Sequence, residues 1–380
     1  MKHIVIIGNG ISGITAARHL RKRSDNRITV ISAETDHFFS RTALMYIYMG
    51  HMKYEHTKPY EDDFWENNRI ELLRDLVQSI DYDNKLLKLK DGEDLAYDKL
   101  ILAVGSKPNK FGWPGQDLDG VQGLYSYQDL QNLERITHAP LSKPEDRTVS
   151  RAVIVGGGLI GVELAEMLLT RDIPVTFLVR ENRFWGNVLP EQEGELVARH
   201  MREHHVDLHF ETELKEILSD ENGRCRAVIT TEGKEIKCQV VGLTAGVSPN
   251  IDFLKNSDLK TDRGIIVNRM LETNIDDVYA IGDCAQFSDP PEGRRSIEQV
   301  WYTGRMMGET IARTLTGQPT EYAPGFWFNS AKFFDIEYQT YGTVSGELQE
   351  GQEEFYWEHV DGKMCIHLIW ESNTRKFTGI

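Results

Sequence analysis

Two glycine-rich segments, far apart in this chain of 380 residues, most constrain its fold. In each, a short apolar run leads into the pattern G-x-G-x-x-G: the first segment has Gly8, Gly10 and Gly13, and the second has Gly156, Gly158 and Gly161. The apolar run predicts a buried strand, and the residues after it have helical spacing. In this pattern the first glycine makes the turn, the second lets a pyrophosphate approach, and the third lets helix pack on strand. Such a turn can be purely structural, but its recurrence favours two dinucleotide-binding units.

The residues that follow the next strand of each unit indicate which ribose is bound. After the strand predicted over residues 27–31, Glu34 is placed to accept hydrogen bonds from an adenosine ribose. After the strand predicted over residues 175–179, Arg180 comes first and suits the 2′-phosphate of NADPH, whereas the adjacent Glu181 could serve a free 2′-hydroxyl. Arg180 favours NADPH over NADH, and Arg183 is a further candidate contact.

Composition and charge argue against several other classes of function. The formal net charge of −16 disfavours nucleic acid and anionic membranes, because both need a basic face. No apolar run approaches the ~20 residues that span a bilayer. The chain begins directly with a strand, which leaves no room for a signal peptide, so we expect a cytoplasmic protein. The four cysteines have no metal-ligand or C-x-x-C spacing, and we expect reduced thiols and no metal.

Further candidate ligand contacts lie where predicted strands end. Ala103 and Gly105 follow a buried strand, and Gly246 follows a similar stretch in the second half; small residues there let the chain pass close to a ligand. Asp283 either caps a helix or hydrogen-bonds a ligand hydroxyl. Trp301 begins a predicted helix whose N-terminus could stabilise an electron-rich ring, although core packing explains this tryptophan equally well.

The pattern changes twice along the rest of the chain. Residues 129–137 read as a helix and 139–150 as a polar loop that precedes the second unit. From residue 326, aromatic strands predicted over 332–344, 354–360 and 363–370 alternate with glycine turns. They predict a small third domain, whose last residues look like the inside of a strand.

Taken in order, four motifs resemble the FAD-dependent pyridine nucleotide–disulfide oxidoreductase superfamily across residues 1–325. They are the first glycine loop, the stretch 102–108, the second glycine loop with Glu163, and Ala280-Ile281-Gly282-Asp283. The resemblance implies an α/β fold with two Rossmann-like domains, the second inserted in the first, and a small α+β C-terminal domain. FAD would bind residues 1–112 and 246–325, NAD(P)H would bind 113–245, and 326–380 would form the interface domain, a common dimer contact in similar proteins.

The segment 38–50 indicates a branch of that superfamily. Its disulfide reductases carry their redox-active cysteines there, and this chain has none, so a thiolate–disulfide relay is excluded at that position. Phe39-Ser40-Arg41 is similar to the Tyr-x-Arg or Tyr-x-Lys segment of rubredoxin reductases, ferredoxin reductases and nitrite reductase flavin domains. Two departures are Thr42, where a proline is usual, and Tyr46 or its neighbours, where a lysine is frequent. We therefore expect Arg41 and Glu163 to position the two rings, although from spacing alone Arg41 could be a surface residue.

The predicted activity is hydride transfer from NAD(P)H to FAD and then electron transfer to an acceptor, for which a carrier protein such as rubredoxin or ferredoxin is the first choice. The alternatives are an NAD(P)H oxidase or a quinone or small-molecule reductase, and, in another class, an FAD- and NAD(P)H-binding regulatory sensor. Candidate docking arginines are Arg294, Arg295, Arg305 and Arg313, although scattered solvated arginines would explain them equally well. The expected FAD contacts are Gly8, Gly10, Ile11, Ser12, Gly13, Glu34, Arg41, Val77, Ala103, Gly105, Asp283, Gln299 and Trp301. The expected NAD(P) contacts are Gly156, Gly158, Leu159, Ile160, Gly161, Glu163, Arg180, Arg183 and Gly246.

Overall fold

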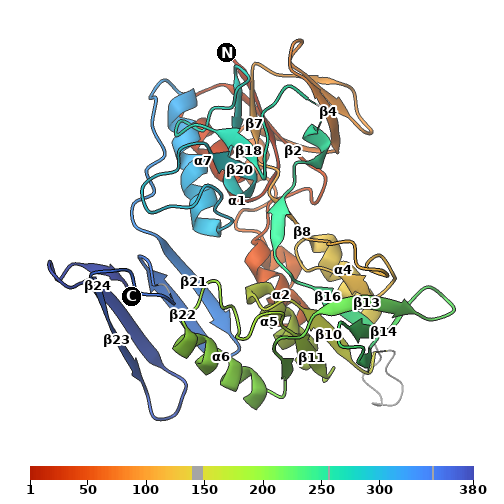
Figure 1. Cartoon of the computed structure of the whole chain (residues 1–380). Helices are drawn as coiled ribbons and strands as arrows, with labels where there is room; N and C mark the ends of the chain where they lie inside the picture. Colours follow the sequence, from red (N-terminus) through yellow and green to blue (C-terminus); the bar gives the residue numbers. More distant parts are fainter. Residues whose placement is uncertain (139–148, 256, 345) are drawn as a thin grey trace. The chain divides into compact units, whose positions relative to one another are not determined.

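The computed structural model describes residues 1–138, 149–255, 257–344 and 346–380 (Figure 1). Most of the loop predicted over 139–150 therefore lies outside the described residues. The chain divides into two compact units. Unit 1 comprises Met1–Leu44, Met52–Lys107 and Ser248–Gly325, and unit 2 comprises Met45–His51, Pro108–Val247 and Phe326–Ile380. The short strands β8 (Ser106–Pro108) and β17 (Val247–Pro249), which pair with each other, lie where the chain leaves unit 1 and returns.

Unit 1 is built on a five-stranded parallel sheet whose order is β19-β7-β1-β2-β3. Its central strands are continuous apolar runs, as expected of a parallel sheet covered on both faces; Ile4, Val5 and Ile6 are fully buried. The strands are β1 (His3–Ile7), β2 (Arg27–Ser32), β3 (Ile70–Arg74), β7 (Lys99–Leu102) and β19 (Val278–Ala280).

Two long helices of unit 1, α1 (Ile11–Arg23) and α7 (Trp301–Leu315), pack closely because α7 carries small residues on the shared face. A Cβ on Gly308 would lie 2.5 Å from the Ser12 carbonyl oxygen, and one on Gly304 would touch Ile11 and Ser12. The two glycines therefore let the backbone of α7 approach the start of α1. They lie four residues apart, and the sequence analysis did not single them out.

Smaller elements complete unit 1. An antiparallel sheet consists of β4, β5 and β6, and β18 pairs with β20 in parallel. Their bounds are β4 (Val77–Asp81), β5 (Leu86–Leu89), β6 (Leu95–Ala96), β18 (Ile265–Val267), β20 (Ala285–Phe287), η1 (Arg41–Ala43), η2 (Tyr54–Thr57), α3 (Phe64–Asn67), η4 (Asp252–Leu254) and η5 (Gly282–Cys284). The short helix α2 (Leu44–Tyr48) begins at the last residue of the first segment of unit 1.

Unit 2 repeats the same plan with a parallel sheet of order β12-β11-β10-β16-β9 and an antiparallel sheet β13-β14-β15. Its helix α4 starts two residues before the predicted 129, because Ser126 and Asp129 form a reciprocal capping box. The bounds are β9 (Val121–Gln122), α4 (Tyr127–Thr137), β10 (Ala152–Val155), α5 (Leu159–Leu169), β11 (Val175–Leu178), α6 (Glu191–Glu203), β12 (Asp207–His209), β13 (Leu214–Ser219), β14 (Cys225–Thr230), β15 (Glu235–Lys237) and β16 (Val240–Leu243).

The C-terminal strands form a hairpin and a three-stranded antiparallel sheet within unit 2. The single strand predicted over 332–344 was wrong: the segment contains a turn at Phe334 and Asp335, between β21 (Phe328–Phe333) and β22 (Ile336–Tyr341). Phe334 occupies the left-handed position of this turn, with a φ of 55°. Because glycine or asparagine is usual there and neither is present, the sequence gives no sign of the turn. The remaining strands are β23 (Gln352–Glu358), β24 (Cys365–Glu371) and β25 (Phe377–Gly379), the last confirming the predicted terminal strand.

Helix α6 makes polar contacts to these C-terminal strands near both of its ends. Glu193 pairs with the buried His367 of β24 at 2.6 Å, Arg199 pairs with Glu358 of β23, and His200 pairs with Asp335 in the β21–β22 turn. These ties explain why residues 326–380 form one compact unit with the second glycine-loop fold. Among the described residues, no helix is long and apolar enough to cross a membrane.

Candidate functional site

The first glycine loop of unit 1 leaves room for a ligand where its backbone turns. Gly8 has a φ of 115°, and a Cβ there would lie 2.1 Å from the Ala103 carbonyl oxygen, so only glycine fits. Gly13 packs equally closely on the Gly8 carbonyl oxygen. A Cβ on Gly10, by contrast, would meet no atom within 4 Å. The first and third glycines are thus required by packing inside the unit, while the second faces open space at the N-terminus of α1.

The charge around this turn suits a pyrophosphate. Helix α1 has no acidic residue in its first turn, where Ile11 and Ser12 follow Gly10, so its N-terminal N–H groups present a positive potential. Glu34 lies just past β2, and its carboxylate accepts two hydrogen bonds from the Arg41 guanidinium, at 2.8 and 2.5 Å. Carboxylate oxygens can accept further bonds, so Glu34 remains suited to ribose hydroxyls. The loop and Glu34 therefore fit the adenosine and pyrophosphate of FAD.

Asp283 belongs to a second polar cluster of unit 1. It lies inside the 3-10 turn η5, whose N-cap is Ile281, so the carboxylate of Asp283 does not serve as a helix cap. Its Oδ2 accepts a hydrogen bond from the Ser106 hydroxyl at 3.3 Å, and Gln299 donates to the same hydroxyl at 2.7 Å. Ser106 was not singled out from the sequence, yet it joins two predicted FAD contacts that lie far apart along the chain.

The remaining predicted FAD contacts occupy different surroundings. Val77 and Ala103 are buried, and the Ala103 carbonyl oxygen lies directly against Gly8. Gly105 adopts a φ of 65° just before β8. Trp301 is the first residue of α7 and is partly exposed, with its ring edge-on to Tyr302, so core packing does not account for it fully.

The second glycine loop, in unit 2, has the same construction. Gly156 has a φ of 119°, and a Cβ there would lie 2.6 Å from the Thr244 carbonyl oxygen. Gly161 packs against Phe177 and Gly156, whereas Gly158 has only the Trp185 indole within 4 Å of an added Cβ. Leu159 and Ile160 begin α5, which has no acid in its first turn. The described residues therefore provide a second pyrophosphate cradle.

The strand register identifies the residue that corresponds to Glu34 in the second unit. Ile31 pairs with Ile7 in the first sheet, and Leu178 pairs with Val155 in the second. Each accepts a hydrogen bond from the first glycine of its loop, at 2.8 and 3.0 Å. Counted from these two residues, Glu34 and Glu181 occupy the same position. In the sequence Arg180 comes first after the strand and Glu181 is only its neighbour, but the register shows that Glu181 occupies the position of Glu34.

The other predicted NAD(P) contacts are distributed unevenly. Arg180 has a side chain that is 70% exposed and pairs with Glu181 at 2.9 Å. Arg183 folds back and donates a hydrogen bond to the Gly186 carbonyl oxygen at 2.8 Å. Gly246 adopts a φ of 83°, and its carbonyl oxygen accepts a hydrogen bond from the Asn109 N–H. Glu181 rather than either arginine thus occupies the register position that Glu34 holds in the first unit.

Comparisons with known proteins agree with this geometry. Residues 2–308 match the pyridine nucleotide-disulphide oxidoreductase family. The chain belongs to this family. Its relatives include a rubredoxin-NAD(+) reductase of Acinetobacter baylyi, 29% identical over 84% of this chain and 80% of that protein. They also include the ferredoxin–NAD(+) reductase component of the biphenyl dioxygenase system of Paraburkholderia xenovorans, 27% identical over 99% of this chain and 91% of that protein.

A solved structure supports the same fold. A ferredoxin reductase from Rhodopseudomonas palustris superposes with a TM-score of 0.87 and 23% identity, covering 100% of this chain and 90% of that one. The predicted α/β class with two Rossmann-like folds is confirmed. This member of the family is an FAD-dependent NAD(P)H oxidoreductase. FAD, when bound, supplies the redox chemistry by accepting hydride from the nicotinamide, and the protein supplies binding and orientation.

The family resemblance assigns Glu163 a place beside the reacting rings, and its surroundings in unit 2 are acidic. Glu163 is partly buried on α5, one turn before the buried Glu166. Burial raises the pKa of Glu163 to about 7, and the charge of Glu166 acts in the same direction. Lys332, on β21, lies 3.1 Å from Glu166 and 5.9 Å from the ring centre of Tyr46. Lys332 could not be found from the sequence, because it is remote along the chain from the segment near Tyr46 where a lysine is frequent in similar proteins.

We expect the stability of the parent protein to depend on pH through Glu163, and the Glu163→Gln variant to lose this dependence. A carboxyl whose pKa is raised on folding binds more protons folded than unfolded, so the free energy of unfolding falls as pH rises from the ordinary glutamate value to about 7. The upper limit of this loss is about 3 kcal/mol. Urea unfolding at pH 5 and pH 8 measures it.

In that experiment the variant should gain stability relative to the parent at pH 8 and differ little at pH 5. Glu232→Gln, at an exposed turn of the same unit, is the control and should follow the parent at both values. A parent-like pH dependence in Glu163→Gln would show that this carboxyl does not titrate in the expected range.

Proposed function

We propose that this enzyme passes electrons from NADH through FAD to a small electron-carrier protein of the rubredoxin or ferredoxin type. The observation that carries the proposal is the pair of glycine loops, each with a glutamate at the same register position after the second strand of its sheet. Two relatives are named as reductases of rubredoxin and ferredoxin. The absence of cysteine between residues 38 and 50 supports discharge of electrons from the flavin without a dithiol relay.

NADH is our choice of donor, in place of the NADPH preference expected from Arg180. A carboxylate at the Glu181 position accepts hydrogen bonds from the two ribose hydroxyls of NADH and repels the 2′-phosphate of NADPH. Arg180 is paired with that carboxylate and largely exposed, which weakens its case as a phosphate ligand. The relatives' names, which specify NAD(+), agree with this choice.

The residue roles are part of the proposal. Gly10 and Gly158, where the two loops leave space, would lie against the two pyrophosphates, and Glu34 and Glu181 would hold the riboses. Arg41 would fix Glu34 through its two hydrogen bonds. Glu163 would lie at the junction of the rings, as the family resemblance implies, and its raised pKa lets it exchange a proton near neutral pH.

Carrier proteins of this type are commonly acidic, and this chain is acidic as a whole. Docking such a carrier therefore needs a local basic patch. Arg294 does not belong to it, since its side chain is 4% exposed and is bound to Glu298 inside unit 1. Arg305 is exposed but pairs with Glu309, while Arg295 and Arg313 are exposed. Arg295, Arg305 and Arg313 remain candidates.

The location and the oligomeric state of the protein are also part of the proposal. A cytoplasmic location agrees with four free cysteines, among them Cys225 and Cys238, whose sulfurs lie 3.8 Å apart without a disulfide. A homodimer through the C-terminal strands is supported by apolar side chains left exposed on β23 and β24, namely Phe355, Trp357 and Ile366.

An anaerobic titration of the FAD-containing protein tests the proposal. NADH should bleach the flavin absorbance at about one equivalent, NADPH should do so only at much higher concentration, and added rubredoxin or ferredoxin should restore the colour faster than dioxygen or a quinone. Fastest reoxidation by dioxygen would make the protein an NADH oxidase, and by a quinone, a quinone reductase. A protein that binds both nucleotides without bleaching would be a sensor, and the reductase proposal would fail.

A further inference from the structure

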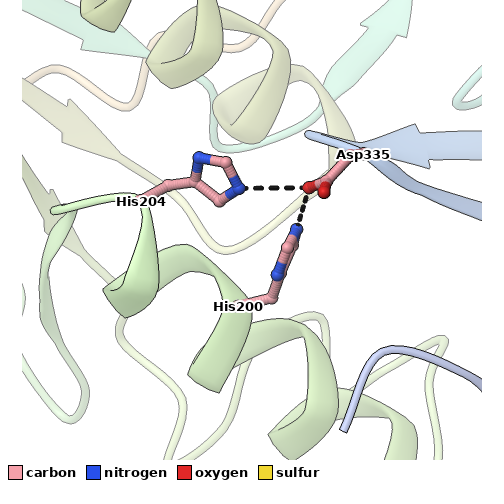
Figure 2. Close-up of side chains that lie close together, drawn as sticks. All are labelled: His200, His204 and Asp335. Atoms are coloured by element: carbon pink, nitrogen blue, oxygen red, sulfur yellow. Dashed lines mark hydrogen bonds and ion pairs between the residues drawn. The ribbon is translucent and has the colours of Figure 1, made fainter. Parts of the chain in front are cut away.

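A cluster of two histidines and an aspartate lies where the C-terminal end of α6 meets the β21–β22 turn in unit 2 (Figure 2). His200 lies in the last turn of α6, and His204, four residues later, is the C-cap of that helix, where its N–H still donates to the His200 carbonyl oxygen. Asp335 projects toward them from the turn between β21 and β22. The Nε2 atoms of both histidines approach the same oxygen, Oδ1 of Asp335, with 3.1 Å between His204 Nε2 and that oxygen.

We infer that His200, His204 and Asp335 form a binding site for a borderline transition-metal dication, of which Zn²⁺ is the best match. One potential ligand atom from each residue lies within 4.8 Å of the others. Two imidazole nitrogens and a carboxylate oxygen are a ligand set that zinc accepts, with metal–ligand distances of about 2.0–2.2 Å and a fourth position for water. Imidazole ligands disfavour Mg²⁺ and Ca²⁺, which prefer oxygen.

The surroundings of the three side chains have features of an established metal site. The second ring nitrogen of His200, Nδ1, is buried, lacks a hydrogen bond, and lies 3.5 Å from the Glu203 carboxylate. A carboxylate beside the distal nitrogen of a ligating histidine orients the ring and increases its basicity. The His204 ring stacks on Phe334, with ring centres 4.4 Å apart and planes at 10°, which fixes its orientation.

Access and charge are also compatible with an incoming ion. The side chain of His200 is 2% exposed, whereas those of His204 and Asp335 are 40% and 61% exposed, so the cluster is closed on one side and open on the other. Lys363 lies 3.9 Å from the other oxygen of Asp335 and opposes a cation, while Glu203 favours one. A dication that takes the place of the hydrogen-bonding protons between the two imidazoles and Asp335 would link the end of α6 to the β21–β22 turn. We assign it this structural role, independent of hydride transfer.

Metal binding by the full-length, tag-free, FAD-containing protein tests this inference. After dialysis against a chelator, calorimetric titration with Zn²⁺ should show one equivalent bound per chain, and Co²⁺ should give the intense visible absorption of a four-coordinate site. Zn²⁺ should also raise the thermal unfolding temperature, because a ligand that binds only the folded state stabilises it.

Two variants and a matched control assign the site. His204→Asn and Asp335→Asn change exposed side chains, so the fold should survive, and each should weaken Zn²⁺ binding by ~100-fold or more. His205→Asn changes the neighbouring exposed histidine, and asparagine tolerates its φ of 64°, so binding should not change. Retained flavin absorbance confirms folding in each case.

Three results would overturn the inference. The first is the absence of stoichiometric Zn²⁺ and Co²⁺ binding by the parent, which would leave the cluster as a hydrogen-bonded tie between helix and turn. The second is parent-like binding by both His204→Asn and Asp335→Asn. The third is an equal loss in His205→Asn, which would place the ion elsewhere.

Discussion

The Glu181→Arg variant should reverse the donor preference of this enzyme. In the parent, the carboxylate at the strand end would accept hydrogen bonds from the ribose of NADH, and the variant loses that acceptor. The new guanidinium would instead stand beside Arg180 and offer the 2′-phosphate of NADPH two charged donors. A site built to bind a hydroxyl discriminates strongly, so the ratio of kcat/KM for NADH to that for NADPH should fall by ~100-fold or more.

The measurement is steady-state reduction of an artificial acceptor with each nucleotide, at matched protein and flavin content. Glu221→Arg, at an exposed turn of the same unit, adds the same charge away from the loop and should leave the ratio unchanged. An unaltered ratio in Glu181→Arg would mean that the register equivalence with Glu34 does not extend to nucleotide binding. A parent that already prefers NADPH would contradict the proposed donor.

The Glu298→Ala variant should lose about 3–5 kcal/mol of unfolding free energy. Glu298 and Arg294 form a two-point ion pair, with both nitrogen–oxygen distances at 2.6 Å and side chains only 2% and 4% exposed. Truncation leaves the guanidinium buried without its carboxylate partner, although its Nη1 still donates a hydrogen bond to the Gly325 carbonyl oxygen at 3.1 Å. Because Gln299 follows directly and reaches Ser106, we also expect weaker retention of FAD.

Unit 1 provides a matched control for this variant. Arg305 and Glu309 have the same spacing of four residues, but their pair is exposed, at 56% and 29%. Glu309→Ala should therefore cost less than about 1 kcal/mol. Denaturant unfolding of both variants, read by tryptophan fluorescence and flavin release, gives the comparison. Equal losses in the two would show that burial does not set the strength of the Arg294–Glu298 pair.

Much of the nucleotide-binding architecture could be predicted from local sequence. The glycines at positions 8 and 156 are required by positive φ and by close backbone approach, which no other residue accommodates. Apolar runs of strand length mark β1 and β10 as buried parallel strands. These features are short-range, so the two folds and their cradles follow from the order of residues along the chain.

The sequence left a choice open, or misplaced a side chain, where the answer depended on strand register and packing. Arg180 stands first after the apolar run, and only the pairing of Leu178 with Val155 shows that Glu181 matches Glu34. Arg294 read as a surface cation, although a carboxylate four residues later pairs with it in the interior. A side chain's partner and burial are properties of packing, which residue type alone does not fix.

The sequence by itself determined the fold class, the two nucleotide cradles and the exclusion of a cysteine relay, because turns, periodicity and the absence of a residue type are local properties. Only the tertiary structure brought Ser106 between Asp283 and Gln299, placed Lys332 beside Glu166, and set Asp335 against His200 and His204. Each of these clusters joins segments that are remote along the chain. Their proximity results from the burial of many apolar side chains at once, which no single motif encodes.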